Sequence, residues 1–183
     1  MQDADLLLSL AGIAGVFVGF GALISVRSGD RSEAHEVTWI RWVVSLGVWV
    51  VIAAITPVIV SRYGVSGHEL WLVCSLLGLV LFLGLWIVTE RTTEARELGA
   101  AYSRAQTVGT VAFNLAFGVP VIAALVLIVL GLFPDQEPAL YLTAVGLGLF
   151  QGAFSLLMLV FSQRHAQTAS DPAELPATGG PSV

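Results

Sequence analysis

The chain has 183 residues, of which 56% are hydrophobic and only 11% are charged, and its formal net charge is −5. Soluble domains carry roughly 25% charged residues, so this composition favours a protein that lies in lipid. The sequence has no basic patch that could meet phosphates, which excludes nucleic acid as a partner. The single cysteine, Cys74, excludes an internal disulfide and a thiolate metal site, and we expect it to pack as a small apolar residue.

Five apolar runs follow one another along the chain, and each is long enough to cross a bilayer. We place them at about residues 5–26, 38–61, 69–89, 107–133 and 139–162. A hydrocarbon core of ~30 Å needs about 20 helical residues, and lipid cannot satisfy an open backbone, so each run is expected to be a helix. The predicted fold class is therefore all-α: a polytopic membrane bundle of five transmembrane helices within residues 1–165.

A comparison of the chain with itself at an offset of 70 pairs the second span with the fourth and the third with the fifth. The segment Val51-Ile52-Ala53-Ala54 returns as 121–124, and Leu77-Gly78-Leu79 returns as 147–149. Such a match is typical of a duplicated helical hairpin, with the first span as an extra element. Chance similarity between two segments rich in Leu, Val and Ala is the alternative, and it stays open.

The arginines divide unequally between the two sides of a five-span threading. Only Arg62 lies on one side; the other side carries Arg27, Arg31, Arg41, Arg91, Arg96, Arg104 and Arg164. By the positive-inside rule those seven mark the cytoplasm. The chain has no lysine, a bias that indicates a GC-rich bacterial genome. We therefore expect a multi-pass protein of a bacterial cytoplasmic membrane, with its N-terminus outside and its C-terminus in the cytoplasm.

The tail after the last span, residues 166–183, is rich in Ala, Pro, Thr, Ser and Gly and is expected to be disordered. It contains Leu175-Pro176-Ala177-Thr178-Gly179, which resembles the LPxTG signal that sortases cleave. A sorting signal must be exported and normally precedes a hydrophobic stretch, whereas this segment follows the last span on the predicted cytoplasmic side. We therefore interpret it as part of a cytoplasmic tail.

Residues that could carry chemistry are almost missing from the spans. His35, His68 and His165 fall in connections or at span ends, and the sequence has no catalytic-serine, zinc-protease or phosphate-loop motif. The sequence thus predicts no catalytic residue, no metal and no cofactor, and the protein is expected not to be an enzyme.

Polar and small residues of the fourth span recur every four positions and so share one helix face. They are Gln106, Thr110, Asn114 and Gly118, and the fifth span carries Gln151 near its centre. Buried amides in lipid seek hydrogen-bond partners, so we interpret these polar residues as helix-packing groups and expect Asn114 and Gln151 to face each other. The alternative is that Gln106, Thr110, Asn114 and Gln151 line a narrow polar pathway.

In the first span, Ala11, Gly15 and Gly19 recur at every fourth position and leave one face with almost no side chains. Such a groove permits close approach of another helix in lipid. We expect a helix of the same chain to fill it, with Gly15 and Gly19 facing the bundle interior. A second copy of the protein is the alternative occupant.

Together these features predict a small integral membrane protein with a non-enzymatic, structural or accessory role that depends on helix–helix contacts. The expected partners are the lipid bilayer and either a second copy of the chain or another membrane protein. The alternative function is an oligomeric channel or small-solute transporter that uses the polar stripe of the fourth span.

Overall fold

The computed structural model describes residues 3–28, 34–90 and 104–169, and every structural statement below refers to these residues. The long helices are α1 (Asp3–Ser28), α2 (Ala34–Arg62), α3 (His68–Glu90), α5 (Arg104–Val129) and α6 (Glu137–Ala169), and a short 3-10 helix, η2 (Pro134–Gln136), precedes α6. Each of the five long helices contains a stretch that is long and apolar enough to cross a membrane. The described chain is therefore an all-α, multi-pass membrane bundle, which confirms the predicted fold class.

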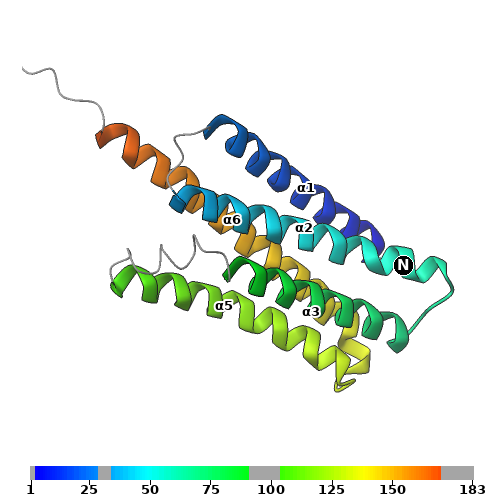
Figure 1. Ribbon diagram of the computed structural model, residues 1–183. Helices are drawn as coiled ribbons and strands as arrows, with labels where there is room; N and C mark the ends of the chain where they lie inside the picture. The colour runs from blue at the N-terminus through cyan, green and yellow to red at the C-terminus, as the bar shows by residue number, and fades with distance from the viewer. Residues whose placement is uncertain (1–2, 29–33, 91–103, 170–183) are drawn as a thin grey trace, which may run out of the picture.

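Four of the helices form a ring, and the first helix lies outside it. Helix α2 packs on α3, α3 on α5, α5 on α6 and α6 on α2, while α1 packs on α2 and α6 (Figure 1). The α2–α3 turn and the α5–α6 turn lie at the same end of the bundle, which we call the turn end (Figure 1). We call the opposite end, where α6 finishes, the tail end.

Two large aromatic residues in the core connect the helices through polar atoms. The Trp49 indole nitrogen donates a hydrogen bond to the carbonyl oxygen of Gly78 at 2.8 Å, which joins α2 to α3. The Tyr141 hydroxyl donates to the carbonyl oxygen of Ala53, also at 2.8 Å, which joins α6 to α2. Because both polar groups find a partner, the two rings can be buried completely without losing hydrogen-bond energy.

The second helices of the two hairpins, α3 and α6, bury equivalent positions. Trp71 and Tyr141 lie 70 residues apart and face each other with ring centroids 5.4 Å apart. Other equivalent pairs are also buried on both helices, namely Cys74/Ala144, Ser75/Val145, Gly78/Gly148 and Phe82/Gly152. For α3 and α6, the packing thus agrees with a duplicated hairpin.

The first helices of the two hairpins do not match in this way. Ala53 is buried in α2 whereas Ala123 is exposed in α5, and Val121 is buried whereas Val51 is only half-buried. Helix α2 packs on α1, α3 and α6, whereas α5 packs on α3 and α6. The two helices therefore have different faces to bury, and the repeat is weaker in α2 and α5 than in α3 and α6.

Helices α5 and α6 end at other residues than the predicted spans. Helix α5 ends at Val129 rather than near residue 133, because Gly131 adopts a φ of +63° and the amide of Leu132 donates back to the carbonyl of Leu127. This is the glycine-terminated Schellman pattern that stops a helix. Helix α6 continues to Ala169, past the predicted end of the fifth span at residue 162. Residues 170–183, including the LPxTG-like segment, lie outside the described residues.

The prediction for the glycine face of α1 is wrong at two of its three residues. Ala11 is buried as expected, but a Cβ atom added to Gly15 or Gly19 would meet nothing within 4 Å. The contact face of α1 instead carries Leu7, Ala11, Ala14 and Gly21. Lipid solvates an apolar outer face as readily as a protein neighbour does, so nothing forces the glycines inward.

The close approach of α1 to α2 takes place at a glycine of α2. A Cβ atom on Gly47 would lie 2.5 Å from Cγ2 of Val18 and 3.4 Å from the carbonyl oxygen of Ala14. Gly47 therefore forms the socket that lets the two backbones approach, and it is buried.

The different surroundings of Gly47 and Gly15 allow a test of how α1 is oriented. We expect Gly47→Leu to lower the free energy of unfolding by about 1–3 kcal/mol, because the added atoms overlap Val18. Gly15→Leu should leave stability nearly unchanged, since its side chain would enter open space. Thermal unfolding of both variants in mild detergent checks the pair, and an equal loss from both would contradict this orientation of α1.

Candidate functional site

The two predicted amides meet at the seam between α5 and α6. Gln151 is 1% exposed, and its side-chain nitrogen donates to the side-chain oxygen of Asn114 at 3.1 Å. This bond satisfies the prediction that the two amides face each other. The side-chain oxygen of Gln151 is buried and has no hydrogen-bond partner. One turn further along α6, the Ser155 hydroxyl donates to the backbone carbonyl of Gln151 at 2.9 Å.

The other two members of the predicted polar stripe cannot be placed as side chains. Gln106 and Thr110 belong to α5, but their side chains lie outside the described part of the structure. The amide seam that the structure describes therefore consists of Asn114, Gln151 and Ser155.

Phenylalanine rings pack α5 against α6 beside this seam. The rings of Phe113 and Phe154 stack with centroids 4.6 Å apart, and those of Phe117 and Phe150 lie 5.4 Å apart. Phe113 and Phe117 also touch each other along α5, at 4.9 Å. Because Phe113 precedes Asn114 and Phe150 precedes Gln151, the amide hydrogen bond has apolar rings as its sequence neighbours on both helices. The ring contacts and the amide hydrogen bond therefore both join α5 to α6.

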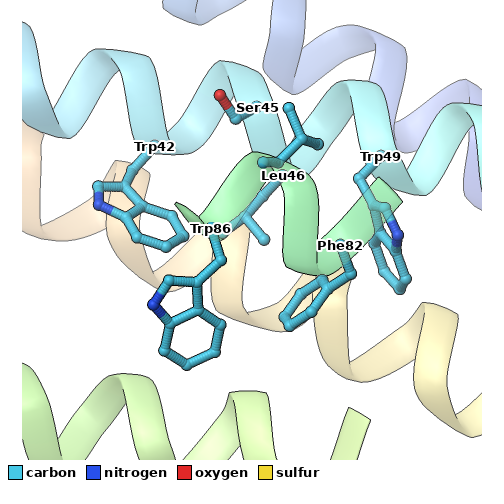
Figure 2. Close-up of a pocket in the computed structure, with 7 residues that line it drawn as sticks. Trp42, Ser45, Leu46, Trp49, Phe82 and Trp86 are labelled. Atoms are coloured by element: carbon cyan, nitrogen blue, oxygen red, sulfur yellow. The ribbon is translucent and has the colours of Figure 1, made fainter. Parts of the chain in front are cut away.

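A row of four aromatic rings fills the contact between α2 and α3, as Figure 2 shows. Trp42 meets Trp86 at 6.2 Å, Trp86 meets Phe82 at 5.8 Å, and Phe82 meets Trp49 at 5.1 Å, each in an edge-to-face arrangement. The rings enclose a void of about 10 Å³, which Ser45, Leu46 and Leu85 also line. That volume is about what one water molecule needs, so this void does not accommodate a solute.

Two of these rings rest directly on glycines of neighbouring helices outside the α2–α3 pair. A Cβ atom on Gly118 of α5 would lie 2.5 Å from Cζ3 of Trp86, and one on Gly148 of α6 would lie 2.4 Å from Cζ3 of Trp49. The tryptophans thus fill contacts between neighbouring helices of the ring, Trp86 between α3 and α5 and Trp49 between α2 and α6. At these two contacts the tryptophan rings occupy the space that a side chain larger than the hydrogen of glycine would need.

At the turn end, an acidic and a basic side chain from different helices meet. Nδ1 of His68, at the start of α3, lies 2.5 Å from Oε1 of Glu137, at the start of α6. Glu137 is 2% exposed, whereas the His68 side chain is 44% exposed. In the described part of the chain, no group of three His, Cys, Asp or Glu residues could hold a metal ion.

The sequence did not predict this contact, because His68 was placed only at the end of a span and Glu137 was not considered. The sequence carries one signal for Glu137, since an acidic residue directly before Pro138 is typical of a helix start. Its partner, 69 positions away, could not be identified without the packing of α3 on α6.

An open hollow lies beside this pair at the turn end. Its volume is about 470 Å³, and its walls are formed by Ser61, Gly64, Val65, Ser66, Gly67, Leu70, Trp71 and Pro138. The walls thus come from the end of α2, the following turn, the start of α3 and the start of α6. Trp71 lines the hollow and also belongs to the hydrophobic core, where it packs on Tyr141.

The amide seam allows a direct measurement of its contribution to stability. We expect Asn114→Leu and Gln151→Leu each to destabilise the protein in detergent, and the double variant to lose less than the sum. Interhelical hydrogen bonds in lipid contribute about 0.6–2 kcal/mol, so the coupling should fall in that range. Unfolding curves for the four proteins of this double-mutant cycle check it, and a coupling of zero would show that the hydrogen bond contributes nothing.

Comparison with known proteins adds one finding. A family model described as polysaccharide biosynthesis protein matches residues 5–133. The matched stretch covers well over half of the chain and runs from α1 to the turn after α5. No curated protein and no solved structure matches the chain.

Proposed function

Because the chain belongs to the family of polysaccharide biosynthesis proteins, we propose that it takes part in making a polysaccharide at a cell membrane as a non-enzymatic component. The chain is an integral membrane protein with five helices that are long and apolar enough to cross a bilayer. In this proposal it acts through helix–helix contacts with a second copy or with another membrane protein.

The observation that carries the proposed action through helix contacts is the packing of the bundle interior. Trp86 and Trp49 lie so close to Gly118 and Gly148 that no side-chain atom could be added between them. The void that the aromatic row leaves is about the size of one water molecule. Interior groups of this kind hold helices together, and the surfaces that remain for partners are the outer faces of the helices.

The buried polar side chains support a non-enzymatic role. They are Ser75, Glu137, Gln151 and Ser155. Acid–base chemistry needs ionisable groups placed beside a substrate, and of these four only Glu137 carries a carboxyl group. Its carboxylate lies at the first residue of α6 and contacts His68, so it serves a contact between two helices.

For the orientation, we propose a bacterial cytoplasmic membrane with the turn end outside and the tail end in the cytoplasm. Seven of the eight arginines support this arrangement through the positive-inside rule. Glu137 and His68 then face the exterior, and α6 finishes on the cytoplasmic side.

A cysteine at Ser66 tests this orientation. Ser66 is exposed in the α2–α3 turn, and Cys74→Ser removes the natural thiol without adding another. We expect a membrane-impermeant maleimide to label Ser66→Cys in intact cells. Labelling that appears only after the membrane is permeabilised would reverse the proposed orientation.

One observation favours the rival function, a channel or small-solute transporter. The side-chain oxygen of Gln151 is buried without a hydrogen-bond donor, although it lies beside an amide that is only half-buried. A pathway lined by amides would leave such acceptors free for a passing solute.

Surface polysaccharide in cells that lack the chain tests the proposed function. We expect deletion to lower the amount of surface polysaccharide and the wild-type gene to restore it. Asn114→Leu should also restore it in proportion to the folded protein present, because the amide would serve packing alone. An unchanged polysaccharide content after deletion would refute the role in biosynthesis. Well-folded Asn114→Leu that fails to restore it would favour the transporter.

A further inference from the structure

We propose that the turn end of the bundle opens to water between α3 and α6, and that the contact of His68 with Glu137 is the clasp that keeps it closed. Four neighbouring features of the turn end support this opening, and none of them depends on the role in polysaccharide biosynthesis.

The clasp joins the starts of α3 and α6, two helices that pack on each other less than on their other neighbours. Glu137 is almost completely buried, so its carboxylate depends on His68 for a hydrogen bond to a side chain. The His68 ring also lies against the α5–α6 turn, because a Cβ atom on Gly131 would be 3.4 Å from Cε1 of His68. One exposed residue therefore connects α3 both to α6 and to the turn before it.

Directly beneath the clasp, an aromatic pair closes the same seam. Trp71 of α3 and Tyr141 of α6 lie three and four residues inside the clasp residues, with ring centroids 5.4 Å apart. The Tyr141 hydroxyl is held by the carbonyl oxygen of Ala53. When α3 moves away from α6, the ring of Trp71 therefore separates from a ring that stays fixed on α2.

Below the aromatic pair lies a hydroxyl that the closed structure leaves without a partner. Ser75 is completely buried, and its Oγ makes no hydrogen bond. Other hydroxyls in the helices donate to the carbonyl four residues earlier, namely Ser9, Thr56, Thr143 and Ser155. A buried hydroxyl without a partner costs free energy that one water molecule would recover. Ser75 is thus a group that an opened turn end would hydrate.

The water has a short route, because the hollow at the turn end already reaches Trp71. This hollow of about 470 Å³ is open to the outside and includes Leu70, Trp71 and Pro138 in its walls. Ser75 lies one helical turn beyond Trp71 on the same helix. Separation of the clasp and of the aromatic pair would therefore connect the hollow to Ser75.

The only cysteine of the chain reports on this opening. Cys74 precedes Ser75, and it is completely buried in the closed bundle. We expect N-ethylmaleimide to modify Cys74 slowly in the purified full-length protein. The rate should rise roughly tenfold in His68→Ala, which removes the hydrogen bond to the buried Glu137 side chain, and should also rise in Glu137→Gln.

Two controls separate opening of the turn end from general loss of structure. Glu69→Gln alters an exposed carboxylate beside the clasp and should leave the rate at Cys74 unchanged. In a Cys74→Ser background, Ser155→Cys places a thiol at a buried position nearer the tail end, and its rate should not respond to His68→Ala. An unchanged rate at Cys74 in both clasp variants would overturn the proposal. An equal rise at positions 74 and 155 would also overturn it, since that is the signature of global unfolding.

Discussion

Trp49→Ala should lower the free energy of unfolding by about 3–5 kcal/mol, the largest loss that we expect from a single substitution. The side chain is 1% exposed, rests on Gly148, packs edge-to-face on Phe82 and donates a hydrogen bond to the carbonyl of Gly78. Alanine would leave a cavity where α2, α3 and α6 meet and a backbone carbonyl without its donor. Equilibrium unfolding in detergent, followed by circular dichroism, measures the loss.

Trp49→Phe is the matched control for this prediction. Phenylalanine keeps much of the ring but removes the donor to Gly78, so we expect a smaller loss, with about 1 kcal/mol from the hydrogen bond. If Trp49→Ala were as stable as the wild type, the Trp49 side chain would not stabilise the packing of α2, α3 and α6.

The second large effect is expected for Gly148→Leu. A Cβ atom at this position would overlap the Trp49 ring at 2.4 Å, and the ring lies between α2 and α6, where neither backbone can yield easily. We expect a loss of about 1–3 kcal/mol or more, seen as a lower unfolding temperature and a smaller yield of monodisperse protein.

Gly146→Leu, two residues away on the same helix, controls for helix propensity and apolarity. A Cβ atom on Gly146 would meet nothing within 4 Å, so this substitution should leave stability nearly unchanged. Trp49→Ala should relieve the overlap, so that Gly148→Leu costs less in that background than in the wild type. Equal losses in the two backgrounds would mean that Gly148 does not support Trp49.

The number of helices and the amide contact could be predicted from the sequence because both depend on local patterns. An apolar run of about 20 residues has few alternatives to a membrane helix. Asn114 and Gln151 are polar groups in spans that are otherwise apolar, and a polar group in lipid is driven to find a partner. The end of α5 could also have been placed from its Gly131, a residue that commonly follows a helix end.

The rotation of each helix about its own axis could not be predicted in the same way. In water, a buried face is more apolar than an exposed face, whereas in lipid both faces are apolar. Gly15 and Gly19 of α1 illustrate the consequence, because the same glycines would suit a contact face or a face covered by lipid tails. The structure places them outside and assigns the close contact to Gly47 of α2.

The contacts between residues on different helices could not be predicted from the sequence either. Trp49 and Gly148 belong to different helices, and neither residue has a feature that indicates the other. His68 and Glu137 each fit a role at the start of their own helix. Only the packing of α3, α2 and α6 shows that these residues touch.

Solute flux through liposomes that contain the purified protein tests the central claim most directly. The proposed role, a packed bundle that acts through helix contacts, predicts that glucose and small ions cross these membranes no faster than they cross protein-free liposomes. The result should be the same for Asn114→Leu, Gln151→Leu and the wild type. Flux through the wild-type protein that is lost in a correctly folded Asn114→Leu variant would contradict the claim and establish the amide seam as part of a pathway.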